Sequence, residues 1–186
     1  VAPPPVVSNT AAAVTARRRR HHVVVIIVMN LGGVALGRMG IGARVRGQMM
    51  TVDRHIDAPT AAVWRLLVDL DAWPRWGPTV QRATLDTGDG VLERGAQGRV
   101  WTPVGLSLPF TITDFVPGRR WAWTVAGVPA TAHEVSADGE GSRVRFEVPW
   151  WAAAYLPVCA VALGRIERLA ARPMWRAGSR ASGTRR

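Results

Sequence analysis

The chain has 186 residues, of which 48% are hydrophobic and 20% charged, so it can bury one core of ordinary size. All 24 basic residues are arginine, and the formal net charge is +11. Cys159 is the only cysteine, which excludes an intrachain disulfide and a zinc site built from several thiolates. A single cysteine fits a cytoplasmic protein and is also compatible with an exported one.

The positive charge is confined to the two ends of the chain. Residues 1–49 carry seven arginines and residues 174–186 carry four, with no acidic residue in either segment. Residues 50–173 hold the other 13 arginines and all 13 acidic residues, so their net charge is 13 − 13 = 0. A neutral body with basic tails is not suited to follow a phosphate backbone, so we expect no specific nucleic-acid partner.

Residues 1–49 differ in pattern from the rest of the chain. An arginine run at 17–20 precedes an apolar stretch that begins at Val23. This order is typical of a signal sequence, although the apolar stretch is shorter than the roughly 20 residues that span a membrane. The alternative, which we favour, is a disordered leader or mis-assigned upstream sequence, with the natural start at Met49 or Met50. An exported or membrane-anchored protein stays open if the segment is a genuine signal.

The pattern of a folded domain starts after Met50. Alternation over 51–56 predicts a strand, and Pro59 followed by apolar residues at helical spacing predicts a helix with one buried face. A turn or short second helix follows over 71–76. Six strands separated by glycine and proline turns come next, and their short connections indicate antiparallel pairing. The expected strands span 79–86, 97–103, 106–116, 119–126, 130–137 and 142–149.

A long helix is predicted from about Ala152 to Arg172, where Pro173 ends it. Apolar residues recur along it at spacings of three and four, which gives one continuous stripe. The stripe consists of Leu156, Cys159, Leu163, Ile166 and Ala170. Pro157 is expected to begin this helix or to kink it.

Residues 148–164 carry no charge, so they could be taken for a membrane span. The stretch is short of the length required, contains Pro157 and follows a strand directly, which favours a helix covered by the sheet. We therefore expect a cytoplasmic protein without a membrane partner. Residues 173–186 are expected to form a disordered basic tail.

Three segments of this pattern resemble one known family. The first is 56–59 followed by Val63 and Trp64, which is similar to an opening Ala-Pro-x-x-x-Val-Trp. The second, 69–78, is similar to a segment with Trp-Pro-x-Trp-x-Pro, and the third, 114–123, to a turn between two middle strands. Together they resemble the SRPBCC superfamily, also called START-like, and within it the polyketide cyclase/dehydrase group.

The resemblance covers about residues 50–172 and implies an α+β helix-grip fold. In that fold a seven-stranded antiparallel sheet wraps around a long C-terminal helix, and two short helices follow the first strand. The resemblance implies one ligand-binding domain with an internal hydrophobic pocket. It does not fix the chemistry, because the superfamily consists mostly of ligand binders and many members have no known reaction.

Strand alternation supplies the candidate pocket wall. The candidate ligand-binding residues are Trp76, Phe110, Trp121, Trp123, Phe146 and Leu163. Indoles offer large rigid apolar faces that suit planar ligands, and we expect a cavity of a few hundred Å³. The alternative is that these side chains fill a solid core, and that Trp73 and Trp76 form a hydrophobic plug at the edge of the sheet.

His133 is the candidate general acid or base, because histidine exchanges protons near neutral pH. Asp114, placed on the inward face of its strand, is the candidate partner. Arg99 would orient a carbonyl or enolate oxygen if it points inward. The competing interpretation of His133 is a hydrogen-bonded core residue.

Several motifs are absent from the sequence. There is no nucleophile elbow, no phosphate loop with lysine and no calcium loop. Apart from His21 and His22, no histidine or acidic pair has the spacing of metal ligands, so we expect no metal and no cofactor.

Three functions stay open. The first is a non-catalytic carrier or sensor of a hydrophobic small molecule. The second is a polyketide cyclase/dehydratase-like enzyme, and the third is a membrane-associated lipid-binding protein delivered by residues 1–49. A second polar group that converges with His133 in the pocket would favour the enzyme, and an all-apolar pocket would favour the carrier. The sequence leaves the oligomeric state unknown.

Overall fold

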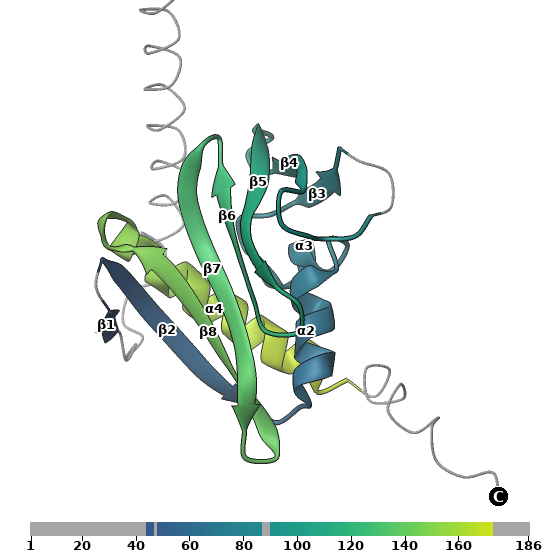
Figure 1. The fold of residues 1–186 in the computed structure, drawn as a ribbon, viewed down its shortest axis with the longest axis vertical. Helices are drawn as coiled ribbons and strands as arrows, with labels where there is room; N and C mark the ends of the chain where they lie inside the picture. The colour runs from purple at the N-terminus through teal and green to yellow at the C-terminus, as the bar shows by residue number, and fades with distance from the viewer. Residues whose placement is uncertain (1–43, 47, 87–89, 173–186) are drawn as a thin grey trace, which may run out of the picture.

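The computed structural model describes residues 44–46, 48–86 and 90–172 (Figure 1). The expectations for the leader before residue 44 and for the tail lie outside these residues. In chain order the elements are β1 (Arg44–Arg46), β2 (Met49–Ile56), α2 (Thr60–Val68), α3 (Trp73–Trp76), β3 (Arg82–Leu85), β4 (Gln97–Trp101), β5 (Ser107–Val116), β6 (Arg120–Val125), β7 (Val128–Asp138), β8 (Gly141–Pro149), the 3₁₀ helix η1 (Trp150–Tyr155) and α4 (Leu156–Ala170).

The strands form one antiparallel sheet in the order β1-β2-β8-β7-β6-β5-β4-β3. The strands from β3 to β8 are a meander, because each pairs with the next along the chain. β2 then pairs with β8 over its whole length, from Met49 opposite Pro149 to Ile56 opposite Ser142. The helix α4 crosses behind β7 and β8 (Figure 1). The predicted helix-grip fold, with its seven strands and two short helices after the first long strand, is confirmed.

The sheet begins earlier than expected. β2 starts at Met49, and the carbonyl of Gln48 accepts a hydrogen bond from the backbone N–H of Trp150 at 2.9 Å. β1 adds an eighth strand at this edge, with Arg44 opposite Thr51. The predicted boundary at residue 50 therefore falls inside a strand.

The C-terminal helix has two parts where one was expected. The 3₁₀ helix η1 leaves helical geometry at Ala152, whose φ and ψ are −100° and 21°, and the α-helix starts at Leu156. Pro157 therefore lies in the first turn of α4, where its missing N–H would have had no intrahelical acceptor. Pro157 thus begins the α-helix and does not kink its interior.

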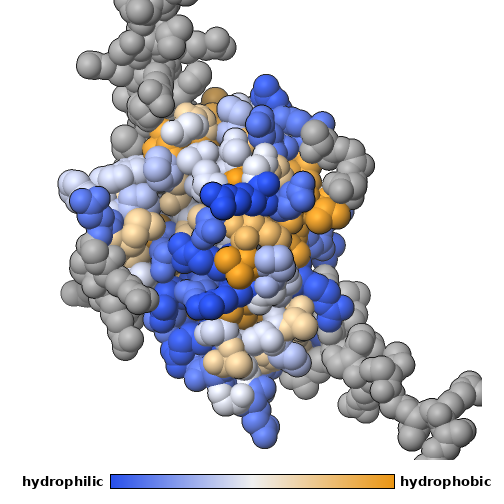
Figure 2. Space-filling model, in the orientation of Figure 1, coloured by the Kyte–Doolittle hydropathy of each residue, from blue (hydrophilic) through white to orange (hydrophobic). Residues whose placement is uncertain are grey.

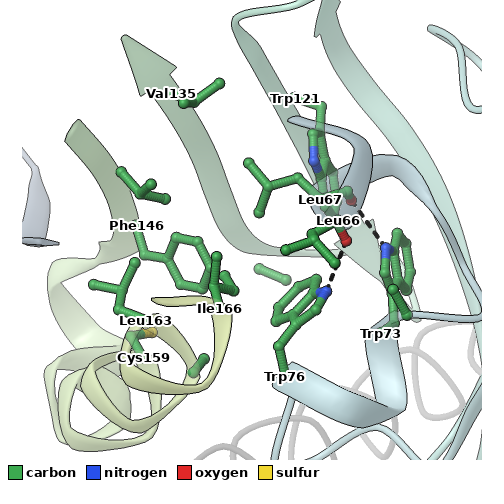
Figure 3. Close-up of a cluster of buried hydrophobic side chains, with 14 of the residues drawn as sticks. Leu66, Leu67, Trp73, Trp76, Trp121, Val135, Phe146, Cys159, Leu163 and Ile166 are labelled. Carbon is green, nitrogen blue, oxygen red and sulfur yellow. Dashed lines mark hydrogen bonds between the residues drawn. The ribbon is translucent and has the colours of Figure 1, made fainter. Parts of the chain in front are cut away.

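The core lies between α4 and the inner face of the sheet. Cys159, Leu163 and Ile166 on α4 are each at most 1% exposed, and they face Phe146 of β8 (Figure 3). Burying one such aliphatic side chain contributes roughly 2 kcal/mol. The helical stripe read from the sequence is the face of α4 that packs on the sheet.

The outer face of the sheet carries ion pairs. Arg143 pairs with Asp53 at 2.7 Å across β8 and β2, and Arg120 pairs with Glu147 at 2.9 Å. Hydrophilic residues cover much of this face (Figure 2). The paired side chains are half-buried and still reach solvent, so each pair adds only about 1 kcal/mol and identifies the solvent side of the sheet more than it stabilises it.

Candidate functional site

The short helix α3 closes one side of the concave sheet, and its two indoles hold the end of α2. The Nε1–H group of Trp76 donates to the carbonyl of Leu66 at 2.8 Å, and that of Trp73 donates to Leu67 at 2.9 Å (Figure 3). Both acceptors lie in the last turn of α2, whose carbonyls have no partner within the helix. The Trp-Pro-x-Trp segment therefore caps α2 with its nitrogens and keeps its ring faces free for packing.

Aromatic rings form a packed cluster beside α3. Trp73 stacks on Trp121, with centroids 5.1 Å apart and planes inclined by 1°. Trp123 meets Trp73 and Trp121 edge-on at 5.2 and 5.7 Å, and Phe110 packs against Trp73 and Trp123. Each such pair contributes about 0.5–1.5 kcal/mol beyond burial of its area, so the cluster forms a rigid wall.

Three neighbouring strands place a second aromatic row next to this wall. Trp121 of β6 is opposite His133 of β7, and His133 is opposite Phe146 of β8. The Trp121 and His133 rings stack with centroids 4.0 Å apart, and Phe146 meets the imidazole edge-on at 4.4 Å. His133 therefore lies on the inner face of the sheet, between an indole and a phenyl ring.

The imidazole of His133 is buried and neutral. Its side chain is 2% exposed, and its Nε2 atom is 3.1 Å from Thr131 Oγ1. Burial, with a smaller effect from the charge of Arg120, lowers the pKa of His133 to about 3. Near neutral pH this histidine carries no charge, which matches the hydrogen-bonded core residue weighed above.

A pocket of about 70 Å³ opens between these rings, α3 and α4. Its wall includes Trp76, Trp121, Trp123, His133 and Phe146. The volume is smaller than the few hundred Å³ expected from the sequence. The difference arises because the indoles of α3 and β6 occupy much of the concavity.

The other two candidate ligand-binding residues do not line this pocket. Phe110 is 2% exposed and packs behind Trp73 and Trp123. Leu163 is 1% exposed and belongs to the core between α4 and the sheet. Both residues support the wall from behind.

Asp114 and Arg99 lie away from His133. Asp114 is 46% exposed and accepts a hydrogen bond from Arg120 at 3.0 Å on the outer face. The register of β5 with β6 shifts between Ile112 and Asp114, so the alternation that turns Ile112 inward no longer applies to Asp114. Arg99 is exposed and donates to Ser107 Oγ at 3.1 Å. The structure does not bring the three catalytic candidates together.

Two polar residues of the pocket lining were not anticipated from the sequence. Thr79 Oγ1 and the Tyr155 hydroxyl are 2.6 Å apart, and both residues line the pocket together with Cys159. Burial raises the pKa of both Tyr155 and Cys159, so both stay protonated near neutral pH. Tyr155 precedes α4 directly, at the end of the 3₁₀ helix η1, which is kinked at Ala152.

No cluster of three metal-ligating side chains occurs among residues 44–46, 48–86 and 90–172. Within the same part of the chain, no helix is long and apolar enough to cross a membrane.

Residues 48–185 match the family described as polyketide cyclase / dehydrase and lipid transport. The chain belongs to this family. Comparison with curated proteins gives no match. Among solved structures, protein NE0264 from Nitrosomonas europaea is 17% identical, with a TM-score of 0.52 over 67% of this chain and 96% of that one. The protein XoxI from Bacillus cereus is 14% identical, with a TM-score of 0.53 over 66% and 94%.

A third similar structure is the Aha1 dimer from Colwellia psychrerythraea, which is 14% identical with a TM-score of 0.50 over 66% of this chain and 96% of that one. Identities this low show a shared fold and nothing about ligands. The SRPBCC-type assignment made from the three sequence segments is confirmed by the family match and by these folds.

Proposed function

We propose that this member of the family binds a hydrophobic small molecule in the pocket between α3, α4 and the sheet, and acts as a carrier or sensor. The observation that carries the proposal is the apolar composition of the pocket lining. Aromatic and aliphatic side chains dominate it, and the described lining residues include no arginine, aspartate or glutamate. An apolar pocket with a few polar groups is the usual form of a site for small hydrophobic ligands.

The ionisable groups of the lining favour a carrier over an enzyme. The pKa of His133 is lowered to about 3, and burial raises the pKa values of Tyr155 and Cys159. All three side chains are therefore neutral near pH 7, and none is poised to exchange a proton. Thr131 does converge with His133, as the enzyme hypothesis requires, but its hydroxyl is already hydrogen-bonded to Trp123 and His133.

The test is calorimetric titration of the full chain with small bicyclic hydrophobes such as indane and 1-indanone. Binding is expected for the wild-type protein. Phe146→Trp should weaken it at least tenfold, because a larger ring fills a pocket of about 70 Å³. Overpacking costs only about 1–3 kcal/mol of stability, so the variant should still fold.

Phe115→Trp is the matched control. Phe115 packs against Trp64, with ring centroids 5.7 Å apart, and is absent from the pocket lining. The control should bind like the wild type. Absence of binding by every hydrophobe, or equal affinity of Phe146→Trp and wild type, would contradict the proposal.

A further inference from the structure

Two buried nitrogen atoms of the pocket wall have no hydrogen-bond partner among the described residues: Nε1 of Trp121 and Nδ1 of His133. Trp121 is 0% and His133 2% exposed, and both residues line the pocket. The neighbouring indoles of Trp73, Trp76 and Trp123 each donate to an oxygen of the protein. Both unpartnered nitrogens therefore belong to residues of the pocket lining, and both atoms are buried beneath its surface.

The hydrogen bonds of Thr131 decide which of these nitrogens are donors. An indole N–H can only donate, so Thr131 Oγ1 accepts from Trp123 Nε1 at 3.0 Å. The same oxygen is 3.1 Å from His133 Nε2, and this contact fits two arrangements: the Thr131 hydroxyl donates to Nε2, or Nε2–H donates to the second lone pair of the oxygen. With Nε2 as acceptor, the neutral imidazole carries its proton on Nδ1. In that arrangement both unpartnered groups are N–H donors, and this arrangement is the premise of the proposal below.

A buried donor without an acceptor is costly, so native structures supply one from the protein, from water or from a ligand. Among the described residues the pocket wall has no charged group, which suits an uncharged acceptor better than a carboxylate that would lose its hydration. We propose that the ligand is a hydrophobic molecule with a carbonyl oxygen, bound by Trp121 Nε1–H and His133 Nδ1–H. This inference rests on the proposed function and specifies its ligand class.

The first test determines the tautomer of His133. The ¹⁵N chemical shifts of the imidazole, measured on the wild-type full chain at neutral pH, are expected to show a protonated Nδ1 and an unprotonated Nε2. A protonated Nε2 would turn Nδ1 into an acceptor and overturn the proposal, whatever the ligand-binding experiments give.

Matched bicyclic probes are the second test. The ratio of the dissociation constant of indane to that of 1-indanone is measured for the wild type and for Trp121→Phe, which keeps an apolar ring and removes the donor. The ratio should fall about tenfold in the variant, which corresponds to one hydrogen bond. Using a ratio cancels the different hydration of the two probes. His133→Phe should lower the ratio as well.

Trp64→Phe is the matched control. It makes the same substitution at a residue outside the pocket lining, so the variant should keep the wild-type ratio of dissociation constants. Both probes could bind with the same ratio of dissociation constants in the wild type and in the variants Trp121→Phe and His133→Phe. In that case the proposed hydrophobic binding stands and the carbonyl inference is wrong. If neither probe binds the wild type, the proposed function itself falls, and the inference falls with it.

Discussion

At the scale of single residues, the fold strongly controls the ionisation of His133. It lies between Trp121 and Phe146 and is 2% exposed, so its charged form would be shielded from bulk water. An unfolded chain binds a proton on this histidine below its ordinary pKa of 6.5, whereas the folded chain binds it only near pH 3. Folding is therefore coupled to the loss of one proton in that range.

This coupling predicts a pH dependence. The contribution of His133 to stability is fully present above pH 6.5 and declines as the pH falls toward 3, by about 1 kcal/mol per pH unit. His133→Phe removes the group that titrates, so its stability should fall less steeply between pH 7 and about pH 5. Urea unfolding of both proteins at the two pH values measures the difference. Parallel pH profiles would contradict the buried neutral state.

The indole nitrogens provide a second prediction at this scale. Trp73→Phe and Trp76→Phe each leave a carbonyl at the end of α2 without its donor, whereas Trp121→Phe removes a donor that has no acceptor in the described part of the chain. The first two variants should therefore lose about 1–3 kcal/mol more stability than the third. Urea unfolding without ligand measures this difference. Equal losses in all three variants would show that ring volume alone decides the outcome.

At the scale of elements, the close approach of β3, β4 and β5 depends on one glycine. A Cβ atom at Gly98 would collide with the carbonyl oxygen of Thr84 and would lie 2.7 Å from Cζ of Phe110. The backbone of the sheet cannot move away without breaking its pairing, and Phe110 is held by Trp73 and Trp123. The glycine thus lets Phe110 reach its place behind the pocket wall.

Gly98→Ala should therefore lose about 3 kcal/mol or more of stability, or prevent folding. Gly164→Ala is the control, because the nearest atom to its Cβ would be 3.8 Å away, at ordinary contact distance, and alanine favours a helix interior by about 0.5–1 kcal/mol. Thermal melting of both variants tests the pair. Similar melting temperatures would mean that the backbone of the sheet can shift enough to accommodate a Cβ atom at residue 98.

The sequence predicted elements better than the site, for physical reasons. Alternation and turn residues determine strands, so β4 to β8 lie close to their predicted positions. The orientation of Asp114 could not be predicted from alternation, because the β-bulge between Ile112 and Asp114 is not visible in the pattern of apolar and polar residues. Tyr155 was missed because it lies in the 3₁₀ helix η1, where one continuous helix was expected. The donors of Trp73 and Trp76 could be assigned only once α2 and α3 were seen side by side.

At the scale of the whole molecule, charge is divided between body and ends. The outer face of the sheet is neutralised by its own ion pairs, and residues 50–173 have a net charge of 13 − 13 = 0. The excess of +11 lies in the segments before and after them. The body and the terminal segments should therefore behave differently toward polyanions.

Double-stranded DNA tests this division. The full chain should bind it weakly, without sequence preference, and should lose binding steeply as salt is raised, because the free energy comes from counterion release. A chain limited to residues 48–172 should not bind. Fluorescence anisotropy of labelled DNA at low and at physiological salt measures both. Salt-resistant or sequence-selective binding by the shorter chain would show that the sheet itself contacts nucleic acid.

The packed indoles also have an optical consequence. Trp73, Trp121 and Trp123 have ring centroids 5.1 to 5.7 Å apart in stacked and edge-on geometry. Electronic transitions of chromophores this close couple, so the ultraviolet circular dichroism of these rings is a shared exciton band and not the sum of three separate signals. A molecule entering beside Trp121, or replacement of any one ring, perturbs the whole band while the backbone stays in place. A dichroism change in this protein therefore reports on the pocket as one optical unit.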